Sequence, residues 1–288
     1  DPATTMNALI TGEIDFWETP SPDLVPGMEG NPDITIKVID PLGTQGWLRP
    51  NHLNPPFDNA KARQALLHMV KQEHYLQAII GDEKFWRACG AYFMCDTPLD
   101  SDVGAGPLMN QDLETARKLL KEGGYNGETL ILMDPTDIPV LHGASLVTAQ
   151  MLRKIGAKVE VQAMDWSTLT SRRAETKSIA DGGWNIFHTY STGADVASPI
   201  ANIGVSGGCV EEAWFGWPCD KTLEDLRDQF SREGDPAKQV EIGIALQKRA
   251  YEVVPYVNYG QWFQPTAYRT SRKGVLISPV PFFWNIEK

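Results

Sequence analysis

The chain has 288 residues, 42% of them apolar, so it is long enough to bury one large core or two smaller ones. Its 37 acidic and 26 basic side chains give a formal net charge of -11, which disfavours nucleic acid and anionic membranes as partners. The longest apolar runs fall far short of the roughly 20 residues that a membrane-spanning helix needs.

The first fifty residues mix short apolar runs with prolines, which excludes one long helix over residues 1–50. The alternation in residues 35–39 predicts a strand. Apolar residues recur at helical spacing through 62–70, behind Asp58 or Asn59 as the capping residue, and predict a helix. A further helical stripe follows at 113–120, and the glycines at 123 and 124 end that helix.

A regular alternation of elements comes next in the chain. Strands are predicted at 129–133, 158–163 and 184–189, with helices at 144–155 and 166–174 between them. This order is a βαβαβ unit, which predicts a parallel or mixed sheet with helices packed on it.

The last hundred residues begin with a region, 193–218, that is rich in Gly, Ser and Trp and is predicted to be loop. Two helices follow, one capped by Asp220 and one from Pro236 to about Val254. The aromatic, proline-broken tail from 256 to 283 is strand-like, and we expect it to return and complete a sheet begun earlier in the chain.

The four cysteines help to predict the cellular compartment of the protein. Cys89 lies six residues from Cys95, and Cys209 ten residues from Cys219. Three connectivities are possible, and local pairing, which closes two short loops, is the simplest. The alternatives are four buried reduced thiols in a cytosolic protein, or a zinc site, which the spacing disfavours. Disulfides persist in oxidising compartments, so we expect a periplasmic protein, although residues 1–9 do not resemble a signal peptide.

One catalytic motif is present. Residues 204–208 satisfy the GxSxG pattern of a nucleophile elbow around Ser206, but no His follows His188, so the chain order of a serine hydrolase is impossible. The five His residues show no HExxH spacing, and no phosphate-binding glycine motif exists. We therefore expect no enzyme, no cofactor and no metal.

Several stretches together resemble the solute-binding proteins of the dipeptide and oligopeptide importer family, extracellular solute-binding protein family 5. The segments that carry the resemblance are ALITGEID at 8–15, NPPFDN at 54–59 with ARQAL at 62–66, ARKLLKEGGY at 116–125, QMLRKIGAKVEV at 150–161, and the pair Asp165 and Trp166. They follow in the family's order, and the similarity covers essentially the whole chain.

The resemblance implies an α/β fold of the two-lobed periplasmic binding protein type (type II, cluster C), with mixed sheets flanked by helices. Family members are longer, so we expect the N-terminal part to be missing. Residues 1–52 and 258–288 are expected in one lobe and 53–257 in the other. Ligand would lie in the cleft between them, enclosed by hinge closure.

The same resemblance nominates ligand-binding residues. Trp166 and Arg173 are expected to face the cleft, with Arg172 as the competing neighbour, and Asp195 is expected to pair with the ligand's amino group. An indole offers a flat apolar wall, and a guanidinium can hold a carboxylate through two parallel hydrogen bonds. The competing interpretations are that Trp166 packs at the start of a helix and that Asp195 is a solvated loop acid or a cap.

Five further residues are nominated on the strand that crosses between lobes and on adjacent loops. They are Trp47, Arg49, Tyr190, Thr192 and Trp217. The expected function is therefore the substrate-binding component of an ABC importer. Such a protein captures a peptide or similar zwitterionic solute as a monomer and delivers it to a membrane permease.

Three rival functions stay open on the sequence. Within the same family, the ligand could instead be a metal chelate, an opine or a sugar. A serine hydrolase would depend on Ser206 alone, and a structural or chaperone-like protein would have no discrete ligand.

Overall fold

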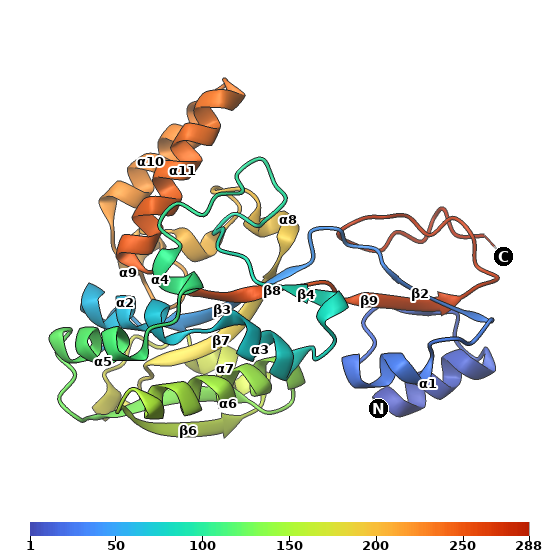
Figure 1. The fold of residues 1–288 in the computed structure, drawn as a ribbon, viewed down its shortest axis with the longest axis horizontal. Coiled ribbons are helices and arrows are strands. Elements are labelled where there is room, and N and C mark those ends of the chain that lie inside the picture. The colour runs from blue at the N-terminus through green and yellow to red at the C-terminus, as the bar shows by residue number, and fades with distance from the viewer. Residues whose placement is uncertain (288) are drawn as a thin grey trace.

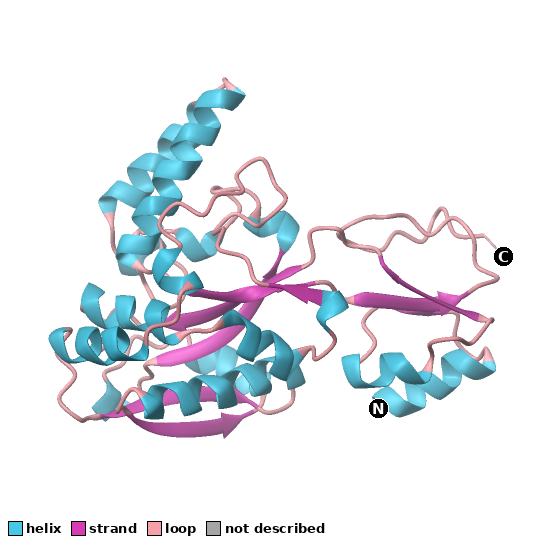
Figure 2. Ribbon diagram, viewed as in Figure 1, coloured by secondary structure: helices cyan, strands magenta, loops and turns pink. Residues whose placement is uncertain are grey.

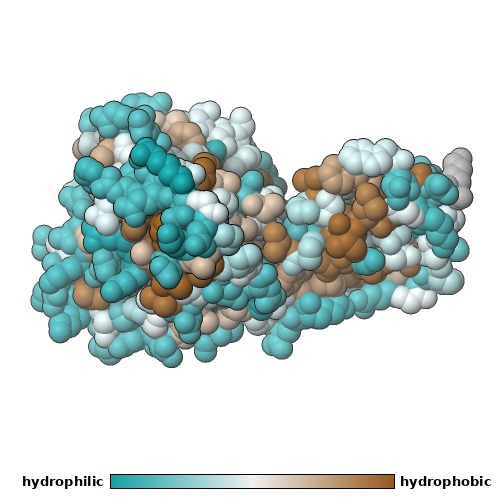
Figure 3. All heavy atoms as spheres, turned by 90° about the horizontal axis from the view of Figure 1, so that it is seen from above, coloured by the Kyte–Doolittle hydropathy of each residue, from teal (hydrophilic) through white to brown (hydrophobic). Residues whose placement is uncertain are grey.

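The computed structural model describes residues 1–287, which form two units, each built around its own β-sheet (Figure 1). Two segments of chain pass between the units. One leads from β2 (Ile34–Val38) to β3 (Thr44–Pro50), and the other from β8 (Val257–Trp262) to β9 (Pro265–Arg269). Figure 3 shows the outline of the molecule narrowing between the two units.

In the smaller unit, helix α1 (Pro2–Thr11) and the 3-10 helix η1 (Pro22–Gly27) accompany a three-stranded antiparallel sheet. The strand order is β1-β9-β2, with β1 at Phe16–Trp17. The side chain of Asp1 caps α1, and Gly12 ends it with a φ of 82°, a left-handed conformation that glycine adopts without strain. The small core consists of Leu9, Met28, Ile34 and Ala267.

The larger unit contains a mixed six-stranded sheet in the order β4-β8-β3-β7-β5-β6. Strand β5 (Thr129–Pro135) runs parallel to β6 (Lys158–Met164) and to β7 (Ile186–Thr192), whereas β3 runs antiparallel to both β7 and β8. The short strand β4 (Trp86–Arg87) closes the other edge. The expected βαβαβ unit with helices packed on a mixed sheet is confirmed.

Alternation along β7 separates the two faces of this sheet, because successive side chains of a strand point to opposite sides. His188 contacts Ser145 and Thr148 of α6 (Pro139–Lys154), which defines the α6 face. Phe187 belongs to the cluster that contains Leu169 of α7 (Trp166–Arg172), which defines the α7 face. The helices of the larger unit thus cover both faces of the sheet.

The remaining helices surround the sheet, and two of them form a hairpin that projects from the larger unit (Figures 1 and 2). The hairpin consists of α10 (Lys221–Arg232), capped by Asp220, and α11 (Pro236–Val253). The others are α2 (Ala60–Met69), α3 (Gln72–Ile79), α4 (Gly106–Met109), α5 (Leu113–Glu122), α8 (Gly193–Val196) and α9 (Cys209–Glu212), with 3-10 turns η2 (Glu83–Phe85), η3 (Ile179–Asp181) and η4 (Ile203–Val205).

The lobe boundary expected at residues 52/53 and 257/258 stays a prediction. The sheets themselves divide the chain elsewhere, because β3 and β8 both belong to the sheet of the larger unit. The chain therefore passes between the units at 39–43 and 263–264, before β3 and after β8. Strands β3 and β8 pair with each other across about 200 residues of sequence, and local sequence patterns carry no trace of such a pairing.

Both local disulfides are present, Cys89–Cys95 and Cys209–Cys219, with Cα–Cα distances of 6.0 and 4.0 Å. Each closes a short loop, as the spacing predicted. No helix within residues 1–287 combines the length and apolar character needed to cross a bilayer.

Candidate functional site

Helix α7 places Trp166 and Arg173 together. Asp165 follows β6 and caps the helix by accepting a hydrogen bond from the Thr168 amide at 2.8 Å, so Trp166 is the first helical residue and Arg173 the C-cap. The two are about two helical turns apart and pack on each other, with the Arg173 guanidinium carbon 5.2 Å from the indole centroid. The sequence-predicted pair therefore forms one structural group.

Three more aromatic rings surround the same guanidinium. Its Cζ atom lies 4.8 Å from the Phe215 ring, 5.0 Å from Trp214 and 5.7 Å from Phe187. Cation–π attraction holds a guanidinium at such distances. We call these five residues, Trp166, Arg173, Phe187, Trp214 and Phe215, the Arg173 cluster; it lies on the α7 face of the sheet.

Arg173 has no anionic partner within residues 1–287. Burial alone accounts for the lowered pKa of its guanidinium, and its Nε atom is buried without a hydrogen-bond acceptor. A half-buried cation of this kind is costly unless an anion is supplied. The two Nη atoms, which are not among the buried atoms, remain for solvent or a ligand.

Trp214 and Phe215 were missed by the sequence predictions. They lie in the loop that the Cys209–Cys219 disulfide closes, and the buried side chain of Arg49 contacts that loop. Arg49 donates to the carbonyl oxygens of Phe215 at 2.6 Å and Trp214 at 3.1 Å. The signal that could have found them is the aromatic run between two paired cysteines.

Three predicted ligand-binding residues lie in the interior of the larger unit, and their role in binding stays a prediction. Arg49 and Trp47 are 0% and 1% exposed, and Trp217 is 5% exposed. The Trp47 ring stacks on Tyr256 and its indole N–H donates to Gln45 at 2.9 Å. Arg49 further donates to Gly204 and Pro255 carbonyls, and Trp217 packs on Trp184 in a core cluster. Their donors and surfaces are already used by the protein.

Arg172 points away from the Arg173 cluster. Its guanidinium donates to the carbonyl oxygens of Gly182 and Gly183 at 3.2 to 3.3 Å, in a polar hollow on the outer side of α7. Of the two neighbouring arginines, Arg173 is therefore the one whose donors are not occupied by the protein.

A second predicted group lies at the end of β7. Thr192 caps the short helix α8, and its hydroxyl donates to the Asp195 carboxylate at 2.8 Å. Asp195 is exposed and has no cationic partner within residues 1–287. Tyr190, 45% exposed, lines a hollow at the junction of the two units together with Trp262 and the 19–22 segment.

No hydrogen bond, ion pair or ring contact joins the two groups within residues 1–287. Phe187, which packs against Arg173, and Tyr190 are three residues apart on β7 and so point to opposite faces of the sheet. The expected arrangement, with Asp195 and Trp166 on one ligand, requires a ligand that contacts both α8 and α7. Tyr190 belongs to the α6 face.

Two residues weighed on the sequence are structural. Ser206 follows the 3-10 turn η4, not a strand, and its hydroxyl donates a hydrogen bond to the Glu224 carboxylate at 3.2 Å. The GxSxG match is therefore not a nucleophile elbow. His188 is completely buried between two α6 hydroxyls, and burial lowers its pKa to about 3, so it does not face a cleft. Within residues 1–287, no cluster of His, Cys, Asp and Glu could hold a metal.

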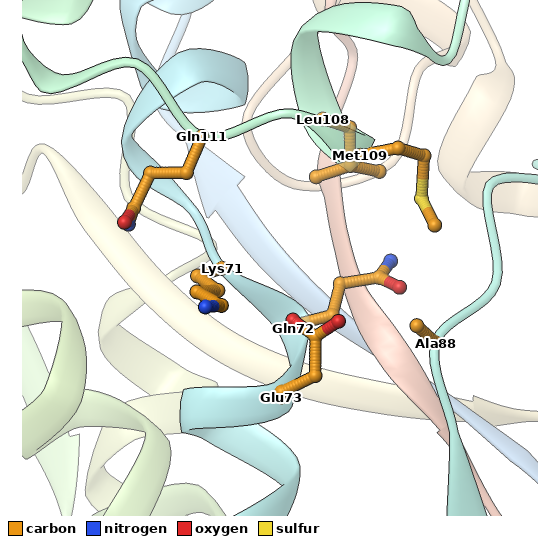
Figure 4. A pocket seen from close by; sticks show the side chains of 7 residues that line it. All are labelled: Lys71, Gln72, Glu73, Ala88, Leu108, Met109 and Gln111. Atoms are coloured by element: carbon orange, nitrogen blue, oxygen red, sulfur yellow. The ribbon is translucent and has the colours of Figure 1, made fainter.

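A separate hollow lies at the start of α3, away from every predicted residue (Figure 4). Lys71 and Glu73 line one side, and Leu108 and Met109 of α4 line the other. The Gln72 amide beneath it is committed to the core, since it donates to the carbonyls of Cys89 and Asn258. Its polar rim carries no group that requires a ligand.

Two α/β units joined by two crossing segments are the arrangement of the two-lobed periplasmic binding protein fold. A model of the family described as bacterial extracellular solute-binding proteins, family 5 Middle, matches residues 1–209. The chain belongs to this family, as the sequence resemblance implied.

Curated relatives agree with this assignment. The chain is 35% identical over 289 residues to the probable peptide ABC transporter periplasmic-binding protein y4tO of Sinorhizobium fredii, covering 100% of this chain and 54% of that protein. It is 23% identical over 288 residues to the di/tripeptide-binding protein 2 of Pseudomonas aeruginosa, covering 97% and 52%. The chain thus spans about half the length of the curated relatives it matches.

Solved structures share the fold. The ABC transporter substrate-binding protein CtaP of Listeria monocytogenes superposes with a TM-score of 0.82 at 18% identity, covering 95% of this chain and 54% of that one. The periplasmic binding protein DppA of Helicobacter pylori, in complex with the peptide STSA, gives 0.81 at 21% identity, with 99% and 55% covered. These confirm the expected two-lobed fold.

Proposed function

We propose that this chain is part of the substrate-binding component of an ABC importer, which captures a peptide or similar small zwitterionic solute and delivers it to membrane permease subunits. The protein would act in the periplasm as a monomer and not as an enzyme. The family assignment supports an importer, and the peptide-binding names of the relatives support a peptide.

The observation that carries the proposal is the state of Arg173. Its guanidinium is half-buried, surrounded by aromatic rings and without an anionic partner within residues 1–287. A ligand carboxylate can accept two parallel hydrogen bonds from such a group. Asp195, an exposed carboxylate without a cationic partner, offers the matching contact for an ammonium group. One cationic and one anionic group without partners support a zwitterionic ligand.

Calorimetry and thermal melting of the full-length protein with di- and tripeptides test the proposal. A peptide at a hundredfold excess over its Kd should stabilise the protein by about 2.7 kcal/mol. Arg173→Gln and Asp195→Asn should each weaken binding at least tenfold, because each removes one charged contact.

Arg232→Gln is the matched control, because Arg232 is 77% exposed and pairs only with Asp228 within its own helix. Its peptide affinity should equal that of the unmodified protein. Stabilisation by a sugar or a metal chelate and by no peptide would instead establish a non-peptide ligand, and unchanged affinity in Arg173→Gln would remove Arg173 from the site.

A further inference from the structure

The loop closed by Cys209–Cys219 presents two aromatic rings to Arg173 in a fixed position. Three constraints hold it: the disulfide, the backbone bridge between Gly208 and Cys219, and the hydrogen bonds from buried Arg49 to the Trp214 and Phe215 carbonyls. A wall held in this way loses little conformational freedom when it meets a ligand.

The turn that aims these rings depends on Gly216. Its φ of 98° is strained for any residue with a side chain, and an added Cβ would lie 2.8 Å from both the Nε of Arg49 and the carbonyl oxygen of Pro50. The chain can therefore reverse between Phe215 and Trp217 only because glycine stands there.

The loop uses its aromatic residues in two ways. Trp217 turns inward and packs on Trp184, at 5% exposure, which anchors the loop to the core. Trp214 and Phe215 are half-buried and flank the guanidinium of Arg173. Trp214 also packs edge-on against the buried Trp47, with ring centroids 6.0 Å apart.

We infer that Trp214 and Phe215 are specificity-determining residues, which select a peptide whose C-terminal residue has an aromatic side chain; the inference rests on the proposed function. The side chain of a C-terminal residue begins two bonds from the carboxylate carbon. When that carboxylate pairs with Arg173, the side chain comes within reach of rings centred about 5 Å from the guanidinium. Aromatic rings whose centroids lie about 4.5–7 Å apart attract one another beyond the area they bury.

Calorimetric titration of the full-length protein with two dipeptides, Ala-Phe and Ala-Gly, tests the inference. The unmodified protein should bind Ala-Phe at least tenfold more tightly. Phe215→Ala should reduce that ratio below threefold, and Phe215→Leu should give an intermediate ratio, because it keeps apolar volume but loses the ring. The leucine variant carries the test if the alanine variant does not fold.

Phe283→Ala is the matched control, since Phe283 is 56% exposed on the smaller unit, outside the Arg173 cluster. Its ratio should stay at the unmodified value. Equal affinity for the two dipeptides, or a ratio that neither Phe215 variant lowers, overturns the inference and leaves the proposed function standing. Binding of neither dipeptide overturns the peptide function, and this inference with it.

Discussion

His188 couples folding to pH through a single buried ring. It lies on β7 at 0% exposure, with its ring nitrogens 3.2 Å from the Ser145 hydroxyl and 2.8 Å from that of Thr148. Burial lowers its pKa from 6.5 to about 3. Between these pH values the unfolded chain takes up a proton that the folded chain excludes. The contribution of the ring to the free energy of unfolding is therefore complete above pH 6.5 and is lost as the pH falls toward 3.

Replacing His188 by Asn should remove this part of the pH dependence and leave that of His52, whose pKa burial also holds well below 6.5. Between pH 7 and pH 5 the ring accounts for a loss of about 2 kcal/mol in the free energy of unfolding, as linkage predicts for a group that titrates only when unfolded. Urea unfolding of both proteins at the two pH values measures the difference, because carboxylates contribute equally to each. Identical pH slopes would show that the ring titrates normally in the fold.

At the scale of elements, capping residues made the helices predictable. Asn59, Asp112 and Asp220 each accept a hydrogen bond from a backbone N–H in the first turn of a helix. The sequence predicted Asn59 and Asp220 as capping residues. The Arg173 cluster was only half predictable. Trp166 and Arg173 share one helix, whereas Trp214 and Phe215 reach it through a disulfide and Arg49, more than 150 residues away in sequence.

The same distinction explains why Trp47 and Arg49, both predicted to bind ligand, are buried. A crossing strand was expected to line a cleft, yet β3 is buried from Gln45 to Pro50 because elements cover both of its faces. Alternation within β3 could not reveal this, since the covering groups, such as Tyr256 on Trp47, come from the far end of the chain.

Asp220 serves the hairpin in two ways that substitutions can separate. Its carboxylate accepts from the Leu223 amide and so caps α10, and it pairs with Arg249 of α11. Asp220→Asn keeps an acceptor for the cap and loses the charge, so it should cost about 1 kcal/mol. Asp220→Ala loses both and should cost about 2 kcal/mol or more. Urea unfolding checks the order, and equal losses would mean that the cap contributes nothing.

At the scale of the whole molecule, the arrangement of the two units depends on a close approach between the two segments that connect them. Gly43 lies in the 39–43 segment with a φ of 66°, and its carbonyl oxygen accepts from the Gly193 amide at the start of α8. The second segment passes directly beside it, since an added Cβ at Gly43 would lie 2.3 Å from the carbonyl oxygen of Trp262. Backbone cannot yield at that distance as a flexible side chain can.

Gly43→Ala tests whether this close approach sets the relation of the two units, and Gly30→Ala supplies the control. Both glycines have a left-handed φ, but nothing lies within 4 Å of a Cβ added at Gly30. The conformational cost, about 1 kcal/mol, is common to both, whereas only Gly43→Ala must also separate the two crossing segments and should lose about 3 kcal/mol in all. Urea unfolding gives the two losses, and small-angle X-ray scattering should detect a changed arrangement of the units in Gly43→Ala alone. Equal losses with unchanged scattering would show that the crossing has room for a side chain, and that contacts elsewhere between the units hold their arrangement.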